Sequence, residues 1–291
     1  MMRSRTLKND VNFSRDRTRR ALKLLQEAVD RQEGIVGETA DLVENQVPEN
    51  VRRGSREHAL FLFAVVPSDR GVKSSLLWSR ARQMHGEFPW LFEPSSFQDL
   101  SLNEAVGRVR ELLSMYLKPR YATNAAVGWV NNAKRLTADF EADARKVFAQ
   151  GQNGADAYKA IRSFFGFGPK TGGMMYRAAT GLGWASAEAA SGVDMPVDTH
   201  DVRIAIQLRI LTSRDPIATS DFQRYASLVR RELTEACQEL GGEWFGIDRA
   251  MWLIGSRGCA RRRCGLCPLV DECSKAEGAA PDGQLRLAGL P

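Results

Sequence analysis

The chain of 291 residues lacks the features that mark membrane, secreted and fibrous proteins. Its longest unbroken apolar run, 59–66, is far shorter than the roughly 20 residues that a membrane-spanning helix needs. No charged and then apolar leader opens the chain, and its 25 glycines and 11 prolines are close to average usage. We therefore expect a folded cytoplasmic protein.

Charge is slightly unbalanced and unevenly spread. The sequence has 41 lysines and arginines against 35 aspartates and glutamates, a formal net charge of +6. Residues 1–24 hold eight of the basic residues and only two acidic ones, Asp10 and Asp16. A basic arm of this kind favours a polyanionic partner, most often nucleic acid, and a solvated tail without a partner explains it equally well.

Apolar residues recur at intervals of three and four rather than two, which is typical of helices. Ser101 and Glu104 also form a capping box ahead of one such stretch. No alternating run is long enough to predict a strand, so the sequence predicts an all-α protein. The stretches with the helical period are 15–33, 102–117, 129–147, 157–163, 202–210 and 222–240.

Two interruptions, at 34–55 and at 181–196, divide the helical pattern. They predict a basic arm with one amphipathic helix over 1–55, followed by a helical domain over 56–180. A second helical domain is expected over 181–275, and a flexible tail over 276–291.

Four of the five cysteines lie within fifteen residues, in the spacing C-x4-C-x2-C-x5-C: Cys259, Cys264, Cys267 and Cys273. In an intracellular chain such a group indicates a bound metal rather than disulfides. Thiolates hold zinc or iron-sulfur clusters, and structural zinc usually shows two Cys-x-x-Cys steps where this loop has one. The spacing therefore favours an iron-sulfur cluster, with zinc as the alternative. Cys237 lies in a helical stripe and is expected to be buried.

Three arginines, Arg261, Arg262 and Arg263, lie between the first two of these cysteines. A loop folded around the metal would present their positive charge outward, where phosphate is the natural target. Compensation of the negative charge of the cluster is a second role that the same side chains could fill.

A glycine-rich turn, FFGFGPKT at 164–171, separates two helical stretches. Two glycines flank Phe167, and such a turn leaves backbone N–H groups exposed at the start of the next helix, where they can bind phosphate. A proline suits the first turn of that helix, and Lys170 follows it. The helix dipole disfavours an ammonium charge there and favours the neutral amine that a nucleophile requires. A plain turn with a solvent-exposed lysine is the alternative.

Asp198 precedes a helical stripe in the stretch VDTH, residues 197–200. The commonest role of an aspartate at that position is to cap the helix. A capping carboxylate is also held rigidly and kept ionised by the N–H groups from which it accepts, which suits a group that stabilises a cation or moves a proton. His200 is expected to pack or hydrogen-bond rather than to catalyse.

In this order, the three motifs resemble those of the endonuclease III branch of the helix-hairpin-helix DNA glycosylases. FFGFGPKT looks like the L-P-G-V-G-x-K-T hairpin of that family, and VDTH matches its V-D-T-H. The cysteine loop resembles its C-x6-C-x2-C-x5-C, which binds a 4Fe-4S cluster. The likeness covers roughly residues 56–275. It implies two helical subdomains, with the helix at 15–33 packed on the cluster domain.

The resemblance implies a monomeric base-excision repair enzyme that binds double-stranded DNA, flips a damaged base and acts as a glycosylase and abasic-site lyase. Lys170 would attack C1′ of the nucleotide, displace an oxidised pyrimidine and form an imine that permits β-elimination of the 3′ phosphate. Asp198 would stabilise the cationic sugar. DNA contacts are expected at Gly166, Phe167, Gly168, Thr171, Arg261, Arg262 and Arg263.

The chain departs from the family pattern at several points. The first cysteine gap is two residues shorter, and Phe165 replaces the proline of the hairpin. The stretch between the lysine and the aspartate is longer than usual, so we expect residues 186–195 to border the pocket and to alter substrate choice. The family has a glutamine-bearing loop that fills the gap left by the flipped base. Here the corresponding stretch, AVVPSDRG at 64–71, offers Ser68, Asp69 or Arg70 for that role.

Two alternatives to a bifunctional enzyme stay open at this point. One is a lyase-only or monofunctional relative, whose altered pocket no longer recognises oxidised pyrimidines. The other is a non-catalytic DNA-binding or redox-sensing iron-sulfur protein that uses the same hairpin and arginines. Replacement of Lys170 separates the catalytic from the non-catalytic hypothesis, because imine formation requires its amine.

Overall fold

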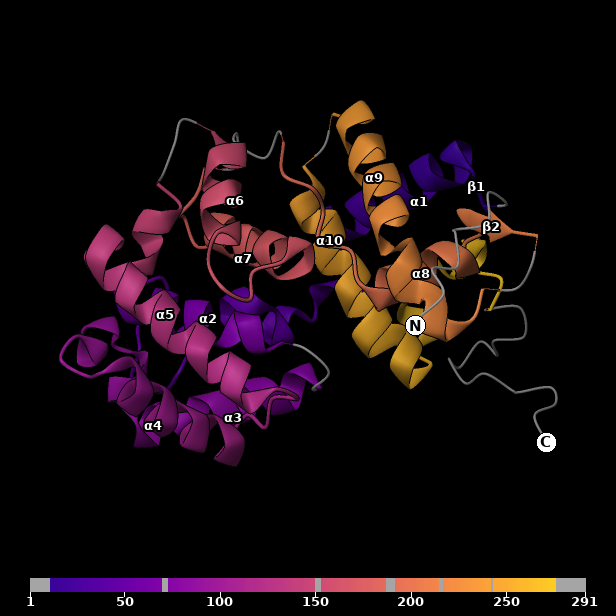
Figure 1. Ribbon diagram of the computed structural model, residues 1–291. Helices are drawn as coiled ribbons and strands as arrows, with labels where there is room; N and C mark the ends of the chain where they lie inside the picture. Colours follow the sequence, from indigo (N-terminus) through magenta and orange to yellow (C-terminus); the bar gives the residue numbers. More distant parts are fainter. Residues whose placement is uncertain are drawn as a thin grey trace, which may run out of the picture. The chain divides into compact units, whose positions relative to one another are not determined.

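The computed structural model describes residues 11–69, 73–149, 153–186, 192–214, 217–241 and 243–275 (Figure 1). Within these ranges the chain folds mainly into ten α-helices, which confirms the all-α prediction. Two three-residue strands, β1 (Val11–Phe13) and β2 (Leu211–Ser213), pair antiparallel with Asn12 opposite Thr212. Strands this short show no period of two, so the sequence pattern gives no sign of them.

The chain forms two compact units. The first combines Met1–Thr39 with Asp194–Pro291, and the second is the continuous stretch Ala40–Val193. The boundaries therefore fall at 39 and 193 rather than at 55 and 180, where the composition changes. Residues 40–55 look like a linker by composition, but Leu42 and Val43 are buried, and the short turn Val43–Asn45 packs on α7 of the second unit.

Six of the described helices belong to the second unit. They are α2 (Arg56–Val65), α3 (Ser74–Glu87), α4 (Leu102–Met115), α5 (Ala122–Phe140), α6 (Gly154–Arg162) and α7 (Pro169–Gly181). Most side chains of α2 are buried, and Phe61 contacts Trp78 of α3. Phe63 contacts Phe164 and Phe167, with ring centroids 4.8 and 4.7 Å apart. Two aromatic residues of the glycine-rich turn are thus anchored in the core of this unit.

Local side-chain and backbone interactions determine where α4 begins and where α5 ends. Ser101 and Glu104 form the capping box that the sequence predicts at the start of α4. The apolar stripe predicts one helix from 129 to 147, but α5 ends at Phe140, because Glu141 and Ala142 adopt left-handed backbone conformations with φ of 51° and 56°. A separate 3-10 turn, Ala144–Val147, carries the remainder of the stripe.

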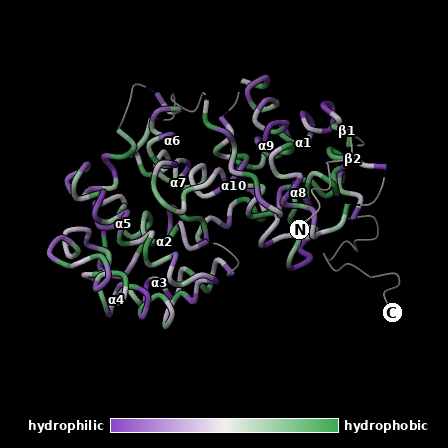
Figure 2. Tube along the Cα trace, viewed as in Figure 1, coloured by the Kyte–Doolittle hydropathy of each residue, from purple (hydrophilic) through white to green (hydrophobic). Residues whose placement is uncertain are grey.

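The first unit contains α1 (Arg15–Arg31), α8 (Thr199–Gln207), α9 (Phe222–Glu239) and α10 (Trp244–Leu253). Helix α1 packs on α9 and α10, so the N-terminal and C-terminal parts of the chain share one core. Helix α9 buries one face, with Phe222, Ala226, Val229 and Leu233 among its buried residues, and Figure 2 shows both hydrophilic and hydrophobic colours along it.

Part of the basic charge of the N-terminal segment is neutralised inside the first unit. The guanidinium of Arg15 lies 3.1 Å from the carboxylate of Glu235, and that of Arg19 lies 2.9 Å from the carboxylate of Glu239. Both acceptors are on α9, so these two arginines stabilise the packing of α1. The basic residues of 1–10 lie outside the described residues.

The remaining sequence predictions concern segments between and beyond the helices. Of the expected loop over 181–196, the described residues 182–186 and 192–196 contain no helix, whereas 187–191 and the tail from 276 lie outside the described residues. In the part of the chain that the structure describes, no helix has the length and hydropathy to cross a membrane.

Candidate functional site

The glycine-rich turn at 164–171 connects α6 to α7 in the second unit. The side-chain hydroxyl of Thr171 makes two hydrogen bonds within the turn. It accepts from the Gly168 N–H at 2.9 Å and donates to the Gly166 carbonyl at 2.9 Å. Pro169 is the first residue of α7, where its missing N–H costs no helical hydrogen bond. One buried hydroxyl therefore fixes the backbone of the turn and directs the chain into α7.

Gly166 is the position at which the turn requires glycine. Its φ of +86° is a backbone conformation that residues with a side chain rarely adopt. A Cβ added at this position would lie 2.6 Å from the Cβ of Pro67. The loop that follows α2 thus packs directly on the turn. Sequence reasoning assigned both segments to the site, and the structure brings them together within the second unit.

Lys170 is the second residue of α7 and faces that same loop. Its Nζ lies 3.5 Å from Oδ2 of Asp69, and the two side chains are 36% and 14% exposed. Of the three residues considered for the family's gap-filling role, Asp69 therefore pairs with the lysine, and Ser68 lines a neighbouring cavity. Arg70 lies outside the described residues. A partly shielded amine next to a carboxylate is an arrangement that can exchange a proton and then act as a nucleophile.

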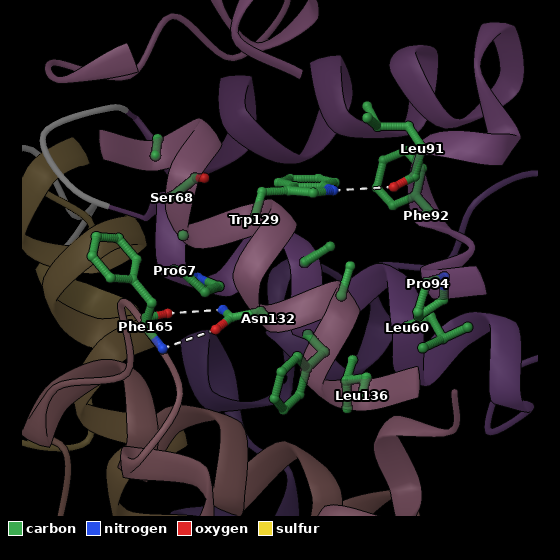
Figure 3. A pocket seen from close by; sticks show the side chains of 15 residues that line it. Leu60, Pro67, Ser68, Leu91, Phe92, Pro94, Trp129, Asn132, Leu136 and Phe165 are labelled. Atoms are coloured by element: carbon green, nitrogen blue, oxygen red, sulfur yellow. Dashed lines mark hydrogen bonds between the residues drawn. The ribbon is translucent and has the colours of Figure 1, made fainter. Parts of the chain in front are cut away.

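Asn132 of α5 holds the turn in place, and sequence reasoning missed it. Its side-chain amide donates to the Phe165 carbonyl at 3.0 Å and accepts from the Phe165 N–H at 2.9 Å (Figure 3). Asn132 is only 9% exposed. An asparagine among apolar residues of a helical stripe is the signal that could have found it, because a buried amide needs hydrogen-bond partners.

A small cavity of about 50 Å³ lies beside the turn, between α2 and α5 (Figure 3). Apolar side chains form most of its wall, and Trp129 donates from its indole N–H to the Leu91 carbonyl at 3.0 Å. The part of the cavity wall that belongs to the turn or contacts it is formed by Pro67, Ser68, Gly128, Asn132 and Phe165.

The residues of the turn that were expected to contact DNA differ in their exposure. Phe167 and Thr171 are each only 3% exposed, and the Phe167 N–H donates to the Phe164 carbonyl at 3.4 Å. Their side chains stabilise the turn from inside. Gly166 and Gly168 are partly accessible, and so is the lysine that follows them.

Asp198 belongs to the first unit, whereas Lys170 belongs to the second. Asp198 caps α8: its carboxylate accepts from the His200 N–H at 2.7 Å, and its own N–H donates to Asp201 at 2.7 Å. The aspartate is therefore held in one orientation by the start of the helix that follows it.

His200 connects α8 to the segment that precedes the cysteines. Its Nδ1 lies 2.9 Å from the guanidinium of Arg203, which also donates to the Gly255 carbonyl at 2.7 Å. A Cβ at Gly255 would lie 2.6 Å from the Cβ of His200. These contacts give His200 a packing and hydrogen-bonding role in the first unit.

The cysteine loop runs through three short 3-10 turns that follow α10 and a π-helical turn, Ile254–Gly258. The pKa of the Cys267 thiol is raised to about 12, first by burial and then by repulsion from the other three cysteines of the loop. Burial likewise raises the pKa of Cys259, while Arg203 lowers it. Cys237 is buried in α9, as expected.

The residues after α1 support this loop. A Cβ at Gly34, whose φ is +56°, would lie 2.4 Å from the Leu266 carbonyl oxygen. Arg263 donates from Nη1 to Glu38 at 2.8 Å, and this contact lowers the pKa of the Glu38 carboxyl. Arg261 and Arg262 are exposed. Of the three arginines expected to contact DNA, Arg263 is thus paired within its own unit.

The loop supplies four thiols on short turns, and thiolates are the ligands that iron-sulfur clusters use. Among the described residues, no three cysteine, histidine or carboxylate side chains are positioned around a single metal ion. Comparisons with family models and with curated proteins give no match to this chain. The argument for function therefore depends on the residues and their geometry.

Proposed function

We propose that this protein is a base-excision repair enzyme, a DNA glycosylase and abasic-site lyase that carries a 4Fe-4S cluster. The observation that carries the proposal is the placement of Lys170. Its amine stands at the start of α7, at the exit of a tight glycine turn, 3.5 Å from the Asp69 carboxylate. The resemblance of three motifs to the endonuclease III branch supports the same assignment.

The chemistry follows from an amine in this setting. The ammonium of Lys170 transfers a proton to the Asp69 carboxylate, and the neutral amine attacks C1′ of a damaged nucleotide. A C–N bond forms as the bond to the base breaks and the base leaves with its electron pair. The sugar ring then opens: the bond between C1′ and the ring oxygen breaks, the oxygen takes a proton, and an imine forms at C1′. The imine accepts the electron pair of the C2′–H bond as the C2′ proton is lost to water. That pair then forms a C2′=C3′ double bond while the 3′ phosphate leaves with the electron pair of its C3′–O bond. Asp198 stabilises the cationic sugar during these steps.

The cluster has a structural role in this proposal. Cys259, Cys264, Cys267 and Cys273 hold it, and its bonds to the thiolates supply a cross-link between the three short turns of the loop. Loss of the cluster is then expected to destabilise the first unit before it affects the amine chemistry of the second. Double-stranded DNA with a damaged base or an abasic site is the partner, and Arg261 and Arg262 are the cluster-loop residues that contact its phosphates.

Borohydride trapping on a duplex with one abasic site tests the proposal. The wild-type protein is expected to form a covalent adduct, because borohydride reduces the imine to a stable amine. Lys170→Ala should form none, whereas Lys159→Ala on the neighbouring α6 should trap like the wild type. Asp69→Asn should trap about 10²- to 10⁴-fold more slowly, since it removes the proton acceptor. Equal trapping by wild type and Lys170→Ala would contradict the proposal.

A further inference from the structure

Phe165 is a large apolar side chain that the turn presents to solvent. It is 51% exposed, whereas Phe164 and Phe167 on either side of it are each 3% exposed. Its two aromatic neighbours in sequence pack against the core ring of Phe63. Phe165 is therefore the one ring of this turn with surface left for a partner, and it is also one of the residues that line the cavity (Figure 3).

The exposed ring of Phe165 packs against a defined position of α5. A Cβ on Gly128 of α5 would lie 1.9 Å from Cδ1 of Phe165, so the ring occupies the space that any other residue at 128 would fill. One turn further along α5, Asn132 hydrogen-bonds both backbone groups of Phe165 at 2.9 and 3.0 Å. Two positions of one helix thus fix the ring and its backbone. A preorganised ring loses little conformational entropy when it binds a flat partner.

The segments that meet at this turn carry cationic residues. Arg162 is exposed at the end of α6, three residues before the ring, and Lys170 follows five residues after it. Arg135 of α5 donates to the Ser163 carbonyl at 3.0 Å and also pairs with Asp139 at 3.2 Å. An exposed aromatic ring on a surface that also carries cations is the combination with which proteins bind a nucleobase together with the phosphates beside it.

We propose that the Phe165 ring stacks on a base of the bound DNA at the point where base stacking is interrupted by the lesion. This inference rests on the proposed function, because it takes damaged DNA as the partner. In an intact duplex both faces of each base are covered by their neighbours, and a wedge must separate them. At an abasic site one face is already free, so the contact forms there at lower cost and contributes to recognition of the lesion.

The test compares two duplexes that differ only by one stable tetrahydrofuran abasic analogue. Phe165→Ala is expected to weaken binding of the abasic duplex about 5- to 100-fold, because base–aromatic stacking is lost. Binding of the intact duplex should change less than about threefold. Phe165→Leu, which stays apolar without a ring, should lose most of the preference, and Phe165→Tyr should keep it.

Tyr121→Ala is the matched control. Tyr121 is an exposed aromatic residue of the same unit, 65% exposed, with the Arg120 guanidinium 5.4 Å from its ring centroid. We expect this variant to bind both duplexes like the wild type. Unchanged abasic preference in both Phe165→Ala and Phe165→Leu overturns the stacking inference. In that case, an adduct that still traps at Lys170 leaves the proposed function standing. A wild-type protein that binds neither duplex overturns both proposals.

Discussion

Alanine replacements of Gly166 and Gly168 test how the backbone of the glycine-rich turn is stabilised. The two glycines are two residues apart, but only Gly166 has a positive φ, +86°, and only its added Cβ would approach Pro67, at 2.6 Å. Gly168 has a φ of −81°, and a Cβ there would meet nothing within 4 Å. The same chemical change therefore meets a strained, crowded position in one case and an open one in the other.

The expected costs follow from these geometries. A left-handed backbone costs alanine about 1–2 kcal/mol, and overpacking against Pro67 adds about 1–3 kcal/mol. Gly166→Ala should thus lower the free energy of unfolding by about 2–5 kcal/mol. Gly168→Ala should stay within about 1 kcal/mol of the wild type, since a weaker helix cap is offset by lower entropy of the unfolded chain.

Urea denaturation followed by far-ultraviolet circular dichroism measures both variants. The wild type and Gly168→Ala should have similar midpoints, and Gly166→Ala should unfold at clearly lower urea. The reasoning is refuted if the two variants unfold at the same concentration, or if Gly168→Ala is the less stable one.

Three further predictions concern other parts of the molecule. Burial lowers the pKa of His58 to about 4 from 6.5, so the free energy of unfolding should fall by about 3 kcal/mol between pH 6.5 and 4. Above pH 6.5 this contribution is fully present, and denaturation titrations of His58→Gln should lack that part of the decrease. Asn132→Leu leaves the backbone of Phe165 without partners and should cost about 1–3 kcal/mol in thermal or urea unfolding. Arg261→Ala should reduce the slope of log K for DNA binding against log salt concentration by about one unit, the value for one phosphate contact. Arg263→Ala should change this slope less, because Arg263 is already paired with Glu38. An equal effect of the two arginine variants would contradict the last of these.

The apolar period predicted some helices, such as α4 and α9, but did not reveal α2, α3 or α10. α4 and α9 show clear apolar stripes, and the capping box marks the start of α4. α2 was missed as a helix because seven of its ten residues are buried and its apolar side chains surround it. Such a run shows no period, and short apolar runs do not distinguish a buried helix from a buried strand.

The parts of the site that lie close in sequence could be predicted, but the contacts between distant segments could not. The turn around Lys170 and the four-cysteine loop are continuous motifs, so spacing alone reveals them. Asp69 reaches the turn from the loop after α2 and Asn132 reaches it from α5, and only the fold shows that they contact Lys170 and Phe165. The pairing of Arg263 with Glu38 is of the same kind, since more than 200 residues separate the two in sequence.

The measurement that tests the central claim most directly is peptide mapping of the borohydride-trapped adduct on an abasic duplex. After digestion, the reduced sugar remnant should be found by mass spectrometry on Lys170, in the peptide that carries the Gly-Phe-Gly-Pro turn. Modification of Lys170 together with cleavage of the DNA strand is the result that this account expects. An adduct on a different lysine, or no adduct from a protein that binds the duplex, would contradict it.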